Sequence, residues 1–345
     1  MASVFSSLVK NVGIDMGTTM TRVYVGGRMP ILSEQSIVAT DAKQQQIIAV
    51  GSEADIMIRR APDLVKEMSP FIDGVIADYR ITRMMIQYFV KKAIGNRFRR
   101  SRIMMTVPYS ITDVEKRAMA DAILQVGSRE AYLVPSPVLI GLSEGAPLFA
   151  PHGTFIADIG GGRTEAMIIS MGGIVVGRSA RIGTNDFNKA IVQYMQDHFQ
   201  VMVSESTVEG IKLSLGTAIA PREEEEVPFR GRDIFTGLYK QLVIRKTEVY
   251  QIFEEPIARM IDAIRSVLEQ APPELAADIM AEGMILSGGG AKIEGIAGRI
   301  QEEFGIKVRL PQDPILAVTR GFESAYREID QMERLLISRK DRKGK

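Results

Sequence analysis

The sequence predicts a protein of the α/β class, with strands and helices alternating along the chain. Short apolar runs of strand length alternate with longer segments in which apolar residues recur at helical spacing. Two Gly-rich turns of the same design, each after an apolar run that ends in Asp, occupy residues 13–19 and 158–164. The 345 residues, 46% hydrophobic and 25% charged, are enough for two sizeable cores, so a multi-lobed globular protein is expected.

The two Gly-rich turns are the strongest functional signal. Asp15 and Asp158 each follow an apolar run and are expected where a strand leaves its sheet. Glycines let consecutive backbone N–H groups converge on an anion, and Thr hydroxyls add donors, which is the geometry that a triphosphate requires. The two carboxylates would hold Mg²⁺ through waters, because this ion keeps much of its hydration shell. The residues expected to bind the phosphates are Gly17, Thr18, Thr19, Gly160, Gly161, Gly162 and Thr164.

A third Gly-rich segment follows the apolar run that ends at Leu286, and its flexible backbone suits the close approach of a flat adenine. Its glycines are Gly288, Gly289 and Gly290. A single Asp-x-Gly-Thr-Thr motif is better explained by an ordinary hairpin with Gly at positive φ. The two Gly-rich turns together with this third segment favour a nucleotide site. The chain has neither a Walker motif nor a complete Gly-x-Gly-x-x-Gly, so two opposed hairpins are preferred to a P-loop or a dinucleotide fold.

Three segments predict amphipathic helices that cover the sheets. Residues Ile81–Ala93 carry apolar side chains on one face. Residues Thr112–Val126 begin with a capping box, because Glu115 follows Thr112 by three positions. Residues Glu254–Gln270 repeat the pattern and are ended by two prolines.

Composition excludes several other classes of function. The chain has no Cys and only two His, so disulfides, thiolate metal sites, zinc sites and a Ser-His-Asp triad are not expected. A net charge of +1 gives no reason to invoke nucleic acid. No apolar run is long enough to span a membrane and the N-terminus lacks a signal-peptide pattern, so a cytoplasmic protein is expected.

With these motifs the chain resembles the actin/Hsp70/sugar-kinase superfamily and, within it, the MreB family of bacterial actins. The resemblance runs nearly end to end and leaves out only the first ten residues and the tail after about Tyr326. Besides the two hairpins, it rests on Asp73–Tyr79, Val107–Thr112, Gly172–Val175, Arg230–Asp233 with Thr236–Leu238, and Pro272–Met280.

The resemblance implies an actin-like fold of two lobes, which are duplicated RNase H-like domains that each carry a small insert, around a central nucleotide cleft. The first lobe would be residues 1–143 with an insert at about 33–69, and the second would be 144–319 with an insert at about 185–247. Residues 320–345 would form a helix that returns to the first lobe, followed by a basic tail. The apolar stripe of this helix is Phe322, Tyr326, Ile329, Met332 and Leu336.

The resemblance also implies contacts with the nucleoside. Glu209 and Lys212 match the Glu and Lys that face it in the family, although the alternative is an ordinary ion pair along a helix. Met20 stands where the family has Asn, and Thr184 where it usually has Gly beside the nucleotide. These two differences should lower the affinity for the nucleotide.

Two further departures concern hydrolysis. Ser136 stands where the family has the Glu that orients the attacking water. Arg163 stands where the family has a Thr in the second hairpin, which positions the same water. Ser cannot accept a proton at neutral pH and Arg only donates, so hydrolysis is expected to be slower by about 10² to 10⁴, or absent. Glu144 lies too far along the chain to substitute. The Arg163 guanidinium could instead reach the γ-phosphate, or it could point into solvent.

A basic segment at residues 91–102 suggests contact with a membrane. In the family, the corresponding loop inserts apolar side chains into lipid, whereas a solvated loop is the alternative. The residues implied in this contact are Ile94, Arg97, Phe98, Arg99 and Arg100. The N-terminal residues 1–10 could add a short amphipathic anchor or have no such role.

These inferences predict a filament-forming, actin-like cytoskeletal protein that binds ATP and Mg²⁺. It would assemble head to tail in single or paired protofilaments on the inner face of the membrane and organise cell-wall synthesis with envelope proteins. Polymerisation is implied by the resemblance alone. The alternatives are a non-hydrolysing scaffold for another cellular structure and, less favoured, a sugar-kinase or chaperone-type ATPase; whether the protein is an enzyme stays open.

Overall fold

The computed structural model describes residues 10–340, apart from residues 42, 44, 45, 62, 70, 73, 74, 77 and 96–100. The predicted N-terminal anchor and the basic end after residue 340 lie outside the described residues. So do four of the predicted membrane-contact residues, Arg97, Phe98, Arg99 and Arg100.

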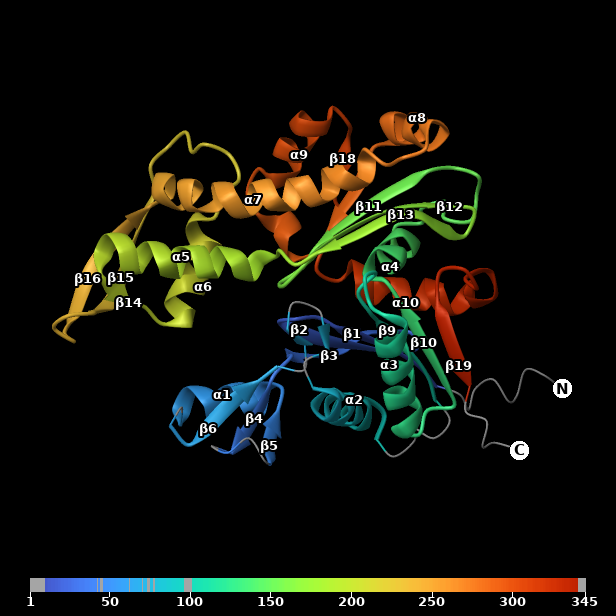
Figure 1. The fold of residues 1–345 in the computed structure, drawn as a ribbon, viewed down its shortest axis with the longest axis horizontal. Helices are drawn as coiled ribbons and strands as arrows, with labels where there is room; N and C mark the ends of the chain where they lie inside the picture. Colours follow the sequence, from blue (N-terminus) through green and yellow to red (C-terminus); the bar gives the residue numbers. More distant parts are fainter. Residues whose placement is uncertain are drawn as a thin grey trace.

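A six-stranded sheet, ordered β19-β10-β9-β1-β2-β3, forms the centre of one half of the molecule (Figure 1). Its first three strands in chain order form a meander, and β9 and β10 run parallel to β1. The strands are β1 (Lys10–Met16), β2 (Met20–Val25), β3 (Arg28–Gln35), β9 (Ser101–Thr106), β10 (Glu130–Val134) and β19 (Ile337–Lys340). Helices α2 (Tyr79–Ile94) and α3 (Asp113–Gln125) bury their apolar faces against one side of this sheet.

A five-stranded sheet, ordered β13-β12-β11-β17-β18, forms the centre of the other half. Its strands are β11 (Thr154–Ile159), β12 (Thr164–Ser170), β13 (Gly173–Ala180), β17 (Met284–Ser287) and β18 (Val308–Arg309). One face packs against α5 (Thr184–Phe199) and the long α7 (Lys246–Leu268). Two shorter helices, α8 (Pro273–Glu282) and α9 (Ile296–Phe304), complete this half.

Helices α4 (Ser136–Ser143) and α10 (Ala317–Arg327) lie between the two sheets (Figure 1). One hydrophobic cluster joins them to both, since it contains Tyr24 and Met104 of the first sheet and Ile156 and Met167 of the second. The two helices therefore form a shared layer, and the fold is the predicted two-lobed α/β arrangement.

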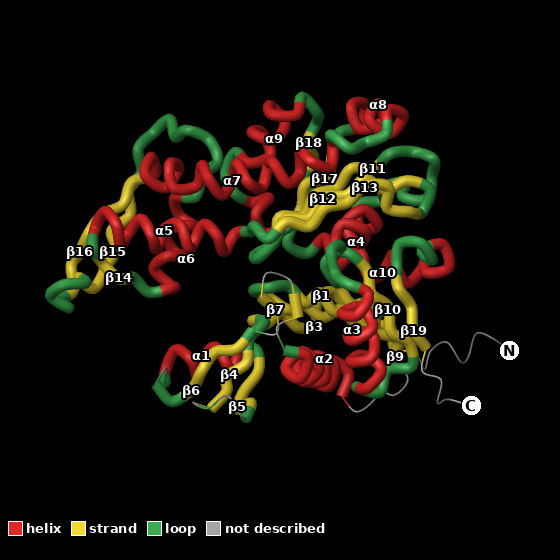
Figure 2. Tube along the Cα trace, viewed as in Figure 1, coloured by secondary structure: helices red, strands yellow, loops and turns green. Residues whose placement is uncertain are grey.

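Two small three-stranded sheets lie at the same end of the molecule, far from β19 (Figure 2). One consists of β4 (Val38–Asp41), β5 (Ile47–Val50) and β6 (Val65–Met68) with α1 (Ser52–Arg60). The other consists of β14 (Val201–Met202), β15 (Glu226–Asp233) and β16 (Tyr239–Arg245) beside α6 (Glu205–Leu215). A short ladder of β7 (Phe71–Ile72) and β8 (Val75–Ile76) follows the first. Both small sheets fall within the predicted inserts, and the exact lobe boundaries stay a prediction.

The predicted helices are present, with local signals that explain their ends. The capping box of α3 has both of its bonds: Thr112 N–H donates to the Glu115 carboxylate at 2.9 Å, and Glu115 N–H donates to Thr112 Oγ1 at 3.3 Å. The third predicted helix, α7, begins eight residues earlier than expected, at Lys246, and contains Pro256.

The prediction of one continuous helix to Leu336 is wrong. Helix α10 ends at Arg327, a 3₁₀ turn covers Ile329–Gln331, and residues 337–340 form β19. The apolar side chain of Met332 is still fully buried. The chain turns because the edge of β10 accepts a further antiparallel strand, and its ladder satisfies backbone groups that a solvated tail would leave unpaired.

We expect Gly321→Ala to destabilise the protein by about 1–3 kcal/mol, because overpacking forces the backbone of the shared layer apart. A Cβ atom at Gly321 of α10 would lie 2.1 Å from the Leu139 carbonyl oxygen of α4. Urea unfolding measures the change. Gly298→Ala in α9 is the matched control, because a Cβ there meets no atom within 4 Å. Equal stability of the two variants would contradict the close approach.

Candidate functional site

The two predicted phosphate hairpins meet face to face. Asp15 and Asp158 are the next-to-last residues of β1 and β11, as predicted. A Cβ atom added to Gly161 would lie 2.4 Å from Thr19 Oγ1, and one added to Gly162 would lie 2.6 Å from Thr18 Oγ1. Only glycine allows the second turn to approach the first this closely, so the hairpins are opposed as the sequence predicts.

The start of α5 closes on the second hairpin. Thr184 N–H donates to the Gly160 carbonyl at 3.0 Å, and Asn185 N–H donates to the Gly161 carbonyl at 2.8 Å. Gly183 is needed here, because its Cβ would lie 2.4 Å from the Gly161 carbonyl oxygen. Thr184, the residue predicted to reduce the room for a nucleotide, is thus fixed beside the turn by its own backbone.

The remaining hairpin residues keep the geometry of a tight turn. Met20, the other predicted departure, accepts a hydrogen bond from Gly17 N–H at 3.0 Å through its carbonyl oxygen. Its side chain is half-buried. Thr164 lies in β12 and donates its hydroxyl to the Ile182 carbonyl at 2.9 Å, so this hydroxyl is engaged within the protein rather than facing the turn.

The third Gly-rich segment lies against the end of β11. Gly288 has φ +87°, and a Cβ there would lie 2.4 Å from Asp158 Oδ1. The following 3₁₀ turn, η3 (Gly289–Lys292), packs as closely, since a Cβ at Gly290 would lie 2.1 Å from Ile159 Cγ2. The three predicted Gly-rich segments therefore converge around the end of one strand.

Burial raises the pKa of both carboxyl groups at these strand ends. For Asp15, this rise in pKa is opposed by the nearby charge of Arg22, by a hydrogen bond from Thr106 at 3.1 Å, and by the charge of Arg163. For Asp158 the pKa rises to about 6, because burial and the negative charges of Glu165 and Asp15 outweigh the hydrogen bond from a neighbouring serine. This concentration of negative charge favours a bound cation.

The described residues suit a hydrated ion. Among residues 10–340, excluding the gaps given above, no group of three or more His, Cys, Asp or Glu side chains has the arrangement of a metal site. Binding of Mg²⁺ by Asp15 and Asp158 stays a prediction, which agrees with the preference of this ion for oxygen ligands and for keeping several waters. Asp15 and Asp158 would hold it through those waters.

Ser136 and Arg163, which are predicted to occupy the positions of the family's water-orienting residues, both contact a buried carboxylate. Ser136 begins α4, is 4% exposed and donates its hydroxyl to Asp158 Oδ2 at 2.6 Å. Its Oγ also lies 3.1 Å from Glu165 Oε2. Arg163 Nε lies 3.7 Å from the same oxygen, and its side chain is 14% exposed, so the alternative in which Arg163 points into solvent is wrong.

Glu165 is the site residue that sequence reasoning missed. It is 1% exposed, and its Oε1 accepts a hydrogen bond from Tyr109 N–H at 2.8 Å. Its signal in the sequence is one carboxylate in an otherwise uncharged run just after the Gly-rich turn. Every residue of this run, β12, is buried in the structure. Glu144 pairs with Arg320 at 3.6 Å, and its exclusion as a substitute for the missing Glu stays a prediction.

Glu209 and Lys212 form the ion pair that the sequence left open as an alternative. Lys212 Nζ lies 2.7 Å from Glu209 Oε2, which also accepts a hydrogen bond from Asn188 of α5 at 3.0 Å. Burial alone would raise the pKa of Glu209, but these two hydrogen bonds outweigh it and lower the pKa. Asn188 Oδ1 is buried and has no hydrogen-bond partner among the residues that the structure describes, which leaves an acceptor for a further group. Contact with a nucleoside stays a prediction.

The predicted membrane role of Ile94 is wrong. Its side chain is 6% exposed and packs in the core beside the six-stranded sheet, where it continues the apolar stripe of α2 after Phe89 and Val90. Apolar burial in the core leaves no surface for lipid. No helix in the described part of the chain is long and apolar enough to cross a bilayer.

Comparison with known proteins identifies relatives of this chain. The family model described as "MreB/Mbl protein" matches residues 9–334. The cell shape-determining protein MreB of Escherichia coli (strain K12) is 36% identical over 337 residues, covering 96% of this chain and 97% of that protein.

Two solved structures agree with this match. MreB5 of Spiroplasma citri bound to ADP superposes with a TM-score of 0.87 at 27% identity, over 93% of this chain and 97% of that one. Its complex with AMPPNP gives 0.86 at 28% identity, with the same coverage. Fold and sequence agree, and the chain belongs to the MreB/Mbl family.

Proposed function

We propose that this protein binds ATP and Mg²⁺ between its two lobes and polymerises head to tail into cytoskeletal filaments, single or paired. The observation that carries the proposal is the meeting of two opposed Gly-rich hairpins beside two buried carboxylates. Nucleotide-bound relatives of the same fold support it, because the MreB5 structures hold ADP and AMPPNP.

We propose further that hydrolysis is slow. The only side chains at the two water-orienting positions are a hydroxyl that is hydrogen-bonded to Asp158 and a guanidinium beside Glu165. Neither accepts a proton at neutral pH. Slow turnover makes a long-lived filament, so a scaffold for a specialised cellular structure is the second candidate, and the side chains at 136 and 163 favour it.

The proposed location is the inner face of the cell membrane, with envelope or cell-wall synthesis proteins as partners. The support is the family membership and the six basic residues in the segment 91–102. Two of the six are engaged within the protein, since Lys92 pairs with Glu34 at 2.7 Å and Arg102 donates to Asn11 at 3.0 Å. Each basic residue near an anionic surface contributes about 1 kcal/mol. Ile94 takes no part, so lipid contact would depend on Phe98 and the basic side chains.

Sedimentation and nucleotide binding test this proposal together. Pelleting is expected with Mg-ATP, and equilibrium dialysis is expected to show bound ATP. Gly183→Ala should weaken ATP binding on the order of tenfold or more, because the added methyl group pushes the backbone of the second hairpin away. Gly26→Ala is the matched control, since a Cβ there meets no atom within 4 Å. No ATP bound and no pellet under any nucleotide would overturn the proposal.

A further inference from the structure

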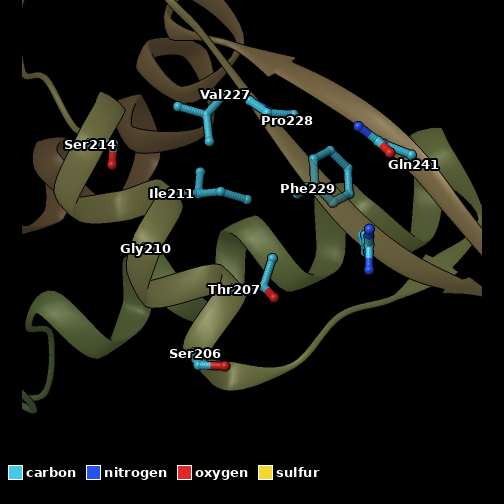
Figure 3. A pocket seen from close by; sticks show the side chains of 10 residues that line it. Ser206, Thr207, Gly210, Ile211, Ser214, Val227, Pro228, Phe229 and Gln241 are labelled. Atoms are coloured by element: carbon cyan, nitrogen blue, oxygen red, sulfur yellow. The ribbon is translucent and has the colours of Figure 1, made fainter.

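A groove with a volume of about 530 Å³ separates α6 from β15 in the second small sheet. Figure 3 shows Ile211 of α6 and Phe229 of β15 on its opposite sides. The helix presents small residues along it: Ser206, Gly210 and Ser214 are four positions apart and lie on one face. This stretch of helix is roughly 12 Å long, about the length of four residues of strand.

The strand that forms the other wall has an unpaired edge. Within the described chain β14 pairs only with Arg232 and Asp233 of β15, so the part of β15 before them has a neighbour only in β16. Asp233 N–H donates to the Leu238 carbonyl at 2.8 Å, and Lys246 N–H donates to the Glu225 carbonyl at 2.8 Å. Both of these bonds involve an odd-numbered residue at or beside an end of β15. Because hydrogen-bonded pairs occupy every second position of an antiparallel ladder, the odd-numbered residues of β15 bond to β16.

The even-numbered residues of β15 therefore direct their backbone polar groups away from β16. Pro228 fits this pattern, because it has no N–H to donate and prolines in sheets occupy edges. Arg230 has both a free N–H and a free C=O on this side, with no bond to any residue that the structure describes. A row of such groups beside a groove is a template for another strand.

The charge of the groove favours an anion at one end. Arg230 is the only charged residue that lines it, is exposed and makes no ion pair within the described residues. Ser206 and Thr207 belong to the first turn of α6, where the helix dipole adds positive potential and the Glu205 carboxylate of the same turn opposes it. Thr207 and Arg230 both line the groove.

We propose that this groove binds an extended peptide from a partner protein, which adds as a strand to the free edge of β15. Its backbone would exchange hydrogen bonds with Arg230 and accept none from Pro228. Its helix-facing side chains would lie over the small residues of α6, above Ile211 and Phe229, which are 1% and 5% exposed. A carboxylate on the opposite, solvent-facing side would lie beside Arg230, because successive side chains of β15 alternate between buried and exposed. Strand addition to a sheet edge next to a helix is a recurrent mode of peptide recognition. The proposal does not depend on nucleotide binding or on hydrolysis.

A dye-labelled peptide of alternating Val and Thr with a free C-terminal carboxylate serves as the probe, and its amidated form as the companion probe. Fluorescence anisotropy with the full-length protein, without nucleotide, is expected to show saturable binding, tighter on the order of tenfold for the carboxylate form. Arg230→Gln should remove the difference between the two probes. Equal affinity of the two probes for the natural protein would overturn the predicted role of Arg230.

Gly210→Leu tests the groove itself. A Cβ at Gly210 meets no atom within 4 Å, so the larger side chain enters the groove without disturbing the helix. It should weaken binding on the order of tenfold or more, whereas Gly298→Leu, at an equally open helical glycine of α9, should leave it unchanged. Unchanged binding to Gly210→Leu would overturn the proposal. A loss of pelleting in Gly210→Leu without probe would also overturn it, because the groove would then hold a second copy.

Hydrogen exchange separates strand addition from other modes of binding. With the carboxylate probe bound, exchange of the Arg230 amide should slow, because its N–H gains a partner. The Phe229 amide, already bonded to β16, should change little. Saturable binding without protection at Arg230 would contradict the added strand.

Discussion

Replacing Ser136 by Glu and Arg163 by Thr is expected to raise the rate of phosphate release from ATP by about 10² to 10⁴. The new carboxylate would stand at the start of α4, where Ser136 Oγ lies 2.6 Å from Asp158 and 3.1 Å from Glu165. It can accept a proton from water, which a hydroxyl cannot do at neutral pH. The Arg163→Thr change replaces a guanidinium that lies 3.7 Å from Glu165 with a hydroxyl that can orient the water, and the gain in rate depends on the new carboxylate at 136.

Phosphate release should be measured beside pelleting, with saturating Mg-ATP, for the natural protein and the double variant. Ser136→Gln combined with Arg163→Thr has nearly the same shape without the base and should not gain activity. Arg178→Thr, at an exposed arginine of β13, controls for the loss of a positive charge. The inference of disabled hydrolysis fails if the natural protein already releases phosphate during assembly at the rate of the double variant.

Asp158→Asn is expected to stabilise the nucleotide-free protein at pH 7 by at most about 3 kcal/mol and to abolish Mg-dependent ATP binding. The pKa of Asp158 is raised from 3.8 to about 6 in the folded state. A raised carboxyl pKa contributes stability that is fully present below pH 3.8 and lost as the pH rises through about 6. At pH 7 the charged group therefore opposes folding, and a neutral amide of the same shape removes that cost.

Urea unfolding at pH 5 and pH 7 measures this effect. The natural protein should lose part of its stability between these pH values, whereas Asp158→Asn should lose less. Asp262→Asn is the control, because that carboxylate is 72% exposed on α7. If Asp158→Asn were no more stable than the natural protein at pH 7, the carboxylate would not be destabilised by burial, and its assignment to a cation site would lose its physical basis.

The hairpins and the capping box could be predicted because their signals are local. An Asp at the end of an apolar run and glycines after it specify a turn whatever lies around them, and Thr112 needs only Glu115 three residues on. The position of Glu165 could not be predicted in this way. Its partner Tyr109 is 56 residues away, so the tertiary structure alone brings them together.

The wrong predictions for Ile94 and for the C-terminal helix share a cause, which is that an apolar side chain can be buried in more than one way. Ile94 continues the apolar stripe of α2. Its helical spacing favours a place in the core, whereas the family resemblance implies lipid contact. Met332 and Leu335 are buried without a continuous helix, because a turn and a strand bury the same residues once β10 offers an edge. Periodicity identifies which residues are buried more reliably than it identifies the element that buries them.

The pairing of β19 with β10 has a consequence for synthesis on the ribosome. Residues 10–35 and 101–134 leave the ribosome early, but the strand that covers β10 is residues 337–340. At a rate of about 5–20 residues per second, the interval between them is on the order of ten seconds or more. The second half, whose sheet lies within residues 154–309, can fold first. Vectorial synthesis thus leaves the first sheet with an open edge until the last strand arrives, and a chaperone that shields this edge would raise the yield of folded protein.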